Sequence, residues 1–363
     1  MQLRWRKLII RVTALTALCA LLLTAERYGN ASTLEQIAAL TRRRFDRIPQ
    51  CRGTLSDQTA SAGLKDGPVE WDALPGALRE QFTMGGRIAR GSEMLRDVSS
   101  ADAERQWNSG DIERRVAVAR MARASMQQHG DVEVAVREAA RSGLTHPYDD
   151  AALINVFAAL HAHPVDGKQG IVLGSETPWL EAILIGFGAA HVTTVEYRPL
   201  SLALDGASAQ LQRNLSVATP RALWTRLASE APPRFDFAFS FSSLEHDGLG
   251  RFGDAIDPSA DLRTLARLRC ALRPRSGRAF VAVPLGPDWL QFNAHRIYGA
   301  VRLPALLAGW HVQSAYGGAA LAPRRIGDAL RRAGKLILFT VTFCANPANN
   351  LTRSPSNILL LLY

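Results

Sequence analysis

The densest group of chemically capable side chains lies between residues 240 and 254. Its polar members are Ser242, Ser243, Glu245, His246, Asp247, Arg251 and Asp254. An imidazole titrates near neutral pH, so His246 is the first candidate for a general base, with Glu245 and Asp247 beside it as further catalytic candidates. His and carboxylate side chains also bind divalent metals, but the spacing matches no specific metal motif, and no metal site is predicted. The alternative interpretation is a capped helix followed by a hydrogen-bonded loop.

A second candidate is the segment GSETP at residues 174–178, which directly follows a short apolar run. A strand-to-helix turn of this kind lets the backbone approach a ligand, although Gly174 is its only glycine. The structural alternative is a helix start, with Thr177 as the cap and Pro178 in the first helical position.

A third candidate is Glu196, which follows the apolar run HVTTV about twenty residues after that turn. In a nucleotide-binding α/β sheet, an acid in this position accepts hydrogen bonds from the two hydroxyls of a ribose. A solvated loop acid is the alternative. Tyr197 is a candidate to stack on an adenine, or else to belong to the core.

Strands and helices alternate regularly around these candidates. Strands are predicted at 171–174, 191–197, 235–241, 278–284, 310–316 and 335–343, and helices at 179–187, 200–214 and 261–272, with one more helix ending near residue 308. This alternation predicts an α/β fold, a Rossmann-like, doubly wound and mostly parallel sheet with both faces covered. Ligands of such sheets bind outside the carboxyl ends of the strands, which is where the three candidate segments fall.

Several uncommon strings occur in order along this region: GSETPWLEAILIGFGAAHVTTVEY, FDFAFSFSSLEHDGLGRFGD, VAVPLG and HRIYGAVRLPALLAGW. Over about residues 146–316 the chain therefore resembles DUF268, an uncharacterised domain family first described from nematode proteins. The order of elements also resembles class I S-adenosylmethionine-dependent methyltransferases. The resemblance implies S-adenosylmethionine as the cofactor, bound by Gly174, Ser175, Glu176, Glu196, Tyr197 and Ser242. The lack of a Gly-rich loop departs from the methyltransferase pattern.

The resulting functional hypothesis is a methyltransferase that acts on an unidentified small-molecule or glycan-like acceptor. His246 or Glu245 would remove the acceptor's proton. Asn293, His295, Arg296 and Tyr298 are expected to line the same cleft. Two rivals remain: a catalytically silent Rossmann-like binding protein and a type II glycosyltransferase, which lacks support because no Asp-x-Asp motif is found.

The N-terminus predicts membrane attachment. Basic residues precede the apolar run VTALTALCALLLTA at 12–25, so residues 1–25 are predicted to form a signal anchor, or a signal peptide that is cleaved. A third interpretation of this N-terminal segment is an organellar transit peptide. The expected location is the endoplasmic reticulum or Golgi, as a single-pass type II membrane protein or a secreted one. Residues 26–145 are predicted to form a helical stem, 146–343 the Rossmann-like domain and 344–363 an irregular tail.

Composition adds little. The net charge of +10 comes from 43 basic residues, of which only four are lysines, and the arginines are scattered rather than gathered on one stripe, so no nucleic-acid partner is predicted. Three Asn-x-Ser/Thr acceptors, at Asn30, Asn214 and Asn350, agree with a lumenal chain. Cys51, Cys270 and Cys344 allow one disulfide or three thiols.

Overall fold

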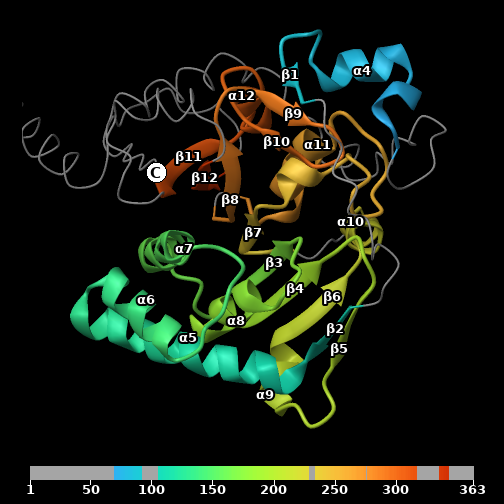
Figure 1. Cartoon of the computed structure of the whole chain (residues 1–363). Coiled ribbons are helices and arrows are strands. Elements are labelled where there is room, and N and C mark those ends of the chain that lie inside the picture. Colours follow the sequence, from blue (N-terminus) through green and yellow to red (C-terminus); the bar gives the residue numbers. More distant parts are fainter. Residues whose placement is uncertain (1–68, 92–104, 229–233, 275, 317–334, 343–363) are drawn as a thin grey trace, which may run out of the picture.

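The protein is built on a seven-stranded sheet with strand order β11-β12-β8-β7-β3-β4-β6 (Figure 1). The computed structural model describes residues 69–91, 105–228, 234–274, 276–316 and 335–342. The strands are β3 (Gln169–Leu173), β4 (His191–Val195), β6 (Leu215–Ala218), β7 (Phe237–Phe241), β8 (Arg278–Leu285), β11 (His311–Tyr316) and β12 (Lys335–Thr342). Strand β12 runs antiparallel to both of its neighbours, and the other pairs are parallel. This is the Rossmann-like arrangement of class I methyltransferases, which confirms the predicted fold class.

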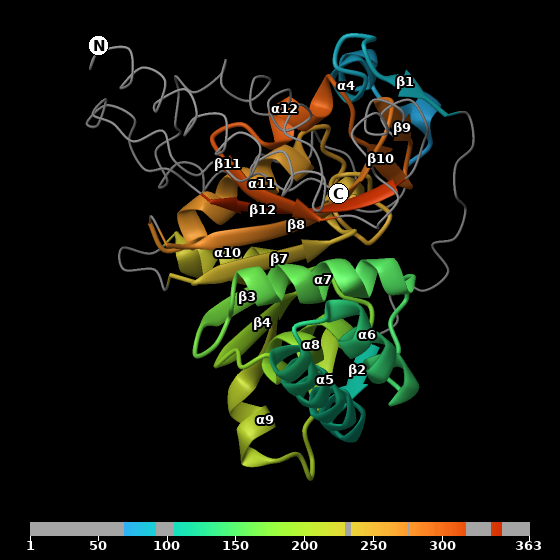
Figure 2. The same cartoon turned by 90° about the vertical axis from the view of Figure 1, so that its left-hand side faces the viewer.

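Helices cover both faces of the sheet (Figure 2). One face packs against α5 (Ser109–His129), α7 (Asp150–Ala162), α8 (Trp179–Gly186) and α9 (Ala209–Asn214), with α6 (Val132–Arg141) behind them. The other face packs against α10 (Pro220–Leu227), α11 (Ala260–Ala271) and α12 (Arg302–Leu306). Adjacent residues of β8 show the period of two, since Phe280 joins the first core and Val281 the second.

Helix α5 belongs to the same core as the sheet. Asn108 caps its start by accepting a hydrogen bond from the amide of Asp111, and Gly130 ends it in a left-handed conformation with φ 67°. At the crossing with α8, a Cβ atom on Gly186 would lie 2.5 Å from the Cβ of Ala119, so only glycine fits there. The domain start at residue 146 stays a prediction, although helices on both sides of it share one core.

A smaller unit packs beside the main sheet. It contains the 3-10 helix at Trp71–Ala73, helix α4 (Gly76–Phe82) and a three-stranded sheet of β1 (Ala89–Arg90), β9 (Trp289–Gln291) and β10 (His295–Ile297). Its separate core includes Phe82, Leu290 and Phe292. Residues near the N-terminus and residues after β8 are thereby brought together (Figure 1).

The predicted helix over residues 200–214 is wrong. The chain instead forms β5 (Leu200–Ala203), a turn in which Gly206 has φ 75°, the short helix α9 and then strand β6. Strand β5 pairs in parallel with β2 (Arg105–Asn108), a distant segment whose contribution the local pattern does not reveal. The predicted helix after Pro284 is also mostly replaced, because β9 and β10 precede the short α12.

The predicted anchor and tail lie outside the described residues, as do Cys51, Cys344, Asn30 and Asn350. Among the described residues, no helix combines the length and apolar character needed to span a membrane. Asn214 corrects one expectation. It is only 6% exposed, its side-chain oxygen accepts from Gln210, and its amide donates to the carbonyl of Ala189, so the folded chain does not offer it as a glycan acceptor.

Candidate active site

A cavity of about 240 Å³ opens at the carboxyl ends of β3, β4 and β7. All three candidate segments reach it: the turn after β3, the acid after β4 and the loop after β7. Its lining includes Arg105, Tyr148, Gly174, Ser175, Glu176, Thr177, Trp179, Glu196, Tyr197, Trp224, Phe241, Ser242, Ser243, His246, Asp247, Arg251, Phe252, Asp254 and Thr264. The position agrees with the rule that open α/β sheets bind ligands at this edge.

The turn after β3 depends on Gly174. Its φ is +65°, and a Cβ atom there would lie 2.3 Å from the hydroxyl oxygen of Ser243. The glycine therefore serves close packing between two loops as well as the turn itself. The predicted cap is wrong, because Pro178 is the N-cap residue and no side chain caps α8. The hydroxyl of Ser175 lies 2.9 Å from the carbonyl oxygen of Thr177.

Directly behind this turn lies Glu181, which sequence reasoning missed. It is fully buried in α8 and accepts a hydrogen bond from the hydroxyl of Thr194 at 2.8 Å, while its other oxygen lies 3.1 Å from the Ser175 hydroxyl. Burial raises its pKa to about 7. The signal was an acid inside the otherwise apolar run WLEAILIG, where a polar side chain must find partners.

Glu196 is surrounded by donors. One oxygen accepts from the amides of Tyr197 (2.8 Å) and Arg198 (3.4 Å). The other accepts from the Ser175 amide at 3.1 Å and pairs with Arg105 at 2.9 Å. A carboxylate offers about four acceptor sites, so this arrangement already uses the group that a ribose diol would need. Arg105 comes from β2, in the predicted stem, and nothing near it in the sequence indicated this pairing.

Tyr197 is not a core residue. Its side chain is 40% exposed at the cavity. Burial of its hydroxyl, with Asp247 and Asp254 nearby, raises its pKa well above the usual value, so the phenol stays protonated.

The loop after β7 begins with a strained residue. Ser242 has φ 51°, a region that non-glycine residues rarely adopt, and its hydroxyl donates to Glu245 at 2.6 Å. Glu245 itself does not line the cavity. It is 2% exposed, and burial raises its pKa to about 7. The structure therefore places it behind Ser242 rather than beside a substrate.

His246 does reach the cavity, with its tautomer set by a backbone contact. Its Nδ1 lies 2.5 Å from the carbonyl oxygen of Ala294, which can only accept, so Nδ1 carries the proton. The other nitrogen, Nε2, then carries a lone pair in the neutral ring and lies 3.9 Å from Oε1 of Glu245. Burial and the charge of Arg251 lower its pKa to about 4, although the Ala294 bond acts in the opposite direction.

Two carboxyl groups of the same loop, Asp247 and Asp254, also line the cavity. Burial raises the pKa of Asp247 to about 8, with a contribution from Asp254, so Asp247 is largely protonated at neutral pH. Asp254 accepts from the amides of Gly250 and Phe252 at 3.1 Å each. Both are therefore better suited to hold the loop than to act as a base.

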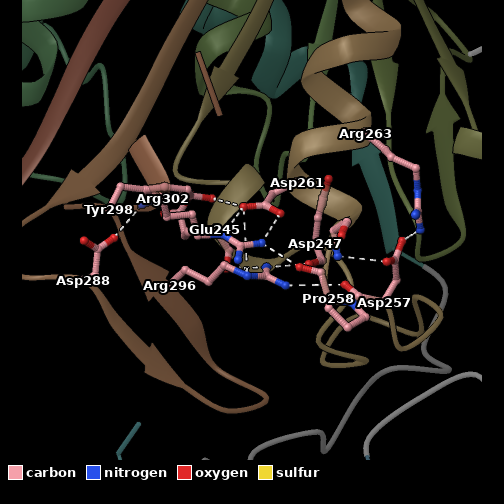
Figure 3. Close-up of polar contacts among 11 residues, drawn as sticks. Glu245, Asp247, Asp257, Pro258, Asp261, Arg263, Asp288, Arg296, Tyr298 and Arg302 are labelled. Carbon is pink, nitrogen blue, oxygen red and sulfur yellow. Dashed lines mark hydrogen bonds and ion pairs between the residues drawn. The ribbon is translucent and has the colours of Figure 1, made fainter. Parts of the chain in front are cut away.

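A buried polar network holds this loop from behind (Figure 3). Arg296 of β10 donates to the carbonyls of Glu245 and Asp247, at 3.4 and 2.5 Å. Asp261 accepts two hydrogen bonds from Arg302 and one from Tyr298. Arg296 and Tyr298, with Asn293 and His295, were expected to line the cleft, and that expectation is wrong because none of the four reaches the cavity wall. Within the described ranges, no group of three His, Cys, Asp or Glu side chains could hold a metal ion.

Among the solved structures with a similar arrangement are several methyltransferases of low identity. An S-adenosylmethionine-dependent methyltransferase from Mesorhizobium loti is 16% identical, with 51% of this chain and 96% of that chain covered and a TM-score of 0.30. Ribosomal protein L11 methylase from Lactobacillus delbrueckii is 14% identical, with 56% of this chain and 83% of that chain covered and a TM-score of 0.32. Haemonchus contortus phosphoethanolamine N-methyltransferase 2, in complex with S-adenosylhomocysteine, is 11% identical. The match covers 62% of this chain and 61% of that chain, with a TM-score of 0.36. The fold assignment rests on the strand order.

Sequence comparisons match part of the chain to a family of unknown function. No curated protein matches the chain. Residues 167–342 match the family described as "Caenorhabditis protein of unknown function, DUF268". That segment begins just before β3 and ends with β12, so it contains the whole seven-stranded sheet. The segment that contains the sheet thus resembles the DUF268 family, and its strand order is that of the class I methyltransferase fold.

Proposed function

We propose that this protein is an S-adenosylmethionine-dependent methyltransferase. The observation that carries the proposal is the convergence of the first turn, Glu196 and His246 on one cavity at the carboxyl ends of the strands. When bound, the cofactor supplies an activated methyl group whose bonding electrons stay on the departing sulfur.

The cavity residues fit this cofactor if Arg105 releases Glu196. Glu196 stands where a ribose diol is held, and Tyr197 offers a partly exposed ring beside it. Arg105 is held incompletely, because its Nε is buried without a hydrogen-bond partner and its Nη1 contacts the Ser175 carbonyl at 3.4 Å. We infer that a bound diol takes over the oxygen that now accepts from Arg105.

His246 is the proposed base. Its Nε2 would take the proton from an acceptor hydroxyl or amine, while Ala294 holds Nδ1–H and fixes the ring. With a pKa of about 4, the ring is already deprotonated at neutral pH. Glu245 is the weaker candidate because it does not reach the cavity.

Calorimetry on residues 26–363 tests the cofactor. We expect micromolar binding of S-adenosylmethionine and S-adenosylhomocysteine, weakened at least tenfold, about 1.4 kcal/mol, by Glu196→Gln. Glu133→Gln, an exposed acid on α6, is the matched control and should bind as the wild type does. Arg105→Gln removes the competitor for Glu196 and should tighten binding about fivefold, the worth of a partly exposed ion pair of about 1 kcal/mol.

Absence of binding by the folded protein would instead favour a catalytically silent scaffold. The saturated carboxylate of Glu196 is the observation that supports this second candidate.

We also propose the secretory route, with residues 1–25 as a type II anchor. The support is the order of basic residues and then an apolar run. Glycosylation at Asn30, measured with an Asn30→Gln control, would place the chain after the anchor in the lumen. An unmodified, protease-accessible chain would contradict the proposal.

A further inference from the structure

Two arginines lie over the phenyl ring of Phe252. Phe252 and Arg251 line the cavity, and Arg198 reaches this ring from outside the lining. The guanidinium carbon of Arg198 is 4.8 Å from the ring centroid of Phe252, and that of Arg251 is 5.1 Å away. The two charges are thus separated by no more than the sum of these distances. They come from different loops, since Arg198 follows β4 and Arg251 lies in the loop after β7.

Neither guanidinium has a carboxylate partner within the described ranges. Arg105, in the same cavity, is paired with Glu196, whereas no ion pair joins Arg198 or Arg251 to an acid of that part of the chain. The Nε of Arg198 is buried and has no hydrogen-bond partner there. Two like charges beside one ring repel each other, and an anion bound by both guanidiniums would lower that cost.

The nearby carboxyl groups Asp247 and Asp254 have other hydrogen-bond partners and form no ion pair with these arginines. Asp254 is engaged by backbone amides, and Asp247 bonds to Thr264 with a pKa raised to about 8 by its burial. The charge of Arg251 acts on two histidines instead. Burial is the largest cause of the lowered pKa of His246 and of His295, and the charge of Arg251 lowers both further.

Phe252 links the arginines to the proposed base. Its ring meets that of His246 edge to face, with centroids 5.4 Å apart at 81°. A group held by the two guanidiniums would thus lie beside the Phe252 ring, which itself contacts the ring of His246. A neighbouring hydroxyl or amine on the same molecule would then be within reach of Nε2 of His246.

Building on the proposed methyl transfer, we propose that the acceptor is an anionic small molecule whose carboxylate or phosphate group is bound by Arg198 and Arg251 over Phe252. Guanidinium groups present paired donors that match the oxygens of both anions. This narrows the expected acceptor from any small molecule or glycan to one that carries a negative charge close to its methylated atom.

Anion binding can be measured without knowing the acceptor. The probes are inorganic phosphate and acetate, each titrated against chloride at constant ionic strength while the melting temperature of residues 26–363 is followed. We expect phosphate, acetate or both to stabilise the wild type, and the Arg198→Gln/Arg251→Gln variant to need at least tenfold more anion. Stabilisation by only one probe identifies the class of the acceptor's charged group.

The matched control is Arg213→Gln. Arg213 is an exposed residue of α9, at the opposite edge of the sheet from the cavity, and its removal should leave anion binding unchanged. The melting temperature of the double variant in chloride checks that it still folds. An equal anion response in the double variant and the wild type, or none in the wild type, would overturn the proposal.

Calorimetry with S-adenosylhomocysteine separates this inference from the function on which it rests. If the double variant loses the anion response but binds S-adenosylhomocysteine normally, both proposals are supported. Arginine-dependent anion binding by a wild type that binds no S-adenosylhomocysteine would refute the cofactor and leave the anion site standing. The reverse result would refute the anion site alone.

Discussion

At the scale of single residues, His246 makes the sharpest prediction, because its tautomer and its pKa have separate causes. The Ala294 carbonyl requires the proton on Nδ1, and burial keeps the ring neutral. Imidazole NMR should show the Nδ1–H form at neutral pH and no titration of this ring until near pH 4.

The same shift has a consequence for stability. The unfolded ring titrates near 6.5, so His246 contributes stability that is complete above that pH and is lost as the pH falls through about 4. His246→Gln should reduce this acid sensitivity. An Nε2–H tautomer would remove the proposed base from consideration, and a pKa near 6.5 would contradict the burial of the ring.

Gly174 allows a test of close packing. Gly174→Ala should destabilise the fold by about 2–4 kcal/mol, since it adds a clash with Ser243 to the cost of a positive φ. Gly130→Ala is the matched control: φ is also positive there, nothing lies within 4 Å, and about 1 kcal/mol is expected. Urea denaturation measures both.

Removing the Ser243 side chain should restore part of the unfolding free energy that Gly174→Ala loses. In a Ser243→Gly background, Gly174→Ala should cost about as much as Gly130→Ala does. An unchanged cost would mean that the loops do not meet as described.

The sequence located Glu196, His246 and Gly174 correctly at the cavity because each follows a buried strand in an α/β sheet, where position alone predicts proximity. Arg105 could not be found in this way. Its contact with Glu196 depends on β2 pairing with β5, and neither short strand carries a distinctive pattern. Arg296 was expected in the cleft because its type suggested binding, but a charge that is fully buried and bonded to carbonyls acts on the protein itself.

At the scale of elements, Asp261 joins α11 to α12 and lies beside β10. Burial alone raises its pKa, but Arg296 and Arg302 more than offset this and hold it below the usual value. Asp261→Asn leaves two buried guanidiniums without their counter-charge, and we expect a loss of about 3–5 kcal/mol in unfolding free energy.

The control for this change is Glu133→Gln, which removes an exposed pair on α6 and should cost less than about 0.5 kcal/mol. The stability that the Asp261 carboxylate contributes is present above its pKa in the unfolded chain and is lost as the pH falls through its lower pKa in the folded protein. The unfolding free energies of Asp261→Asn and Glu133→Gln should therefore converge in acid. Equal stabilities at pH 7 would contradict the network in Figure 3.

At the scale of the whole molecule, the packing of α5 on α8 predicts where the chain can be cut. Every residue of α8 is buried, and α5 shares its core. A protein starting at residue 146 would expose that surface and should unfold without a cooperative transition, whereas one starting at residue 105 should retain it.

Thermal unfolding followed by circular dichroism decides between them. A sharp transition for the chain from residue 146 would support the boundary that the sequence predicts there. The sequence could not address this packing, because residues 105–145 and the sheet each look self-sufficient as amphipathic or apolar segments.

The Arg105–Glu196 ion pair also couples the position of β2 to ligand binding in the cavity. Arg105 belongs to β2, which pairs with β5, so a ligand that displaces the guanidinium removes one side-chain contact that helps to hold β2 beside the cavity. Linkage requires the reverse to hold with equal free energy: any event that pulls β2 away changes the affinity of the cavity by the same factor.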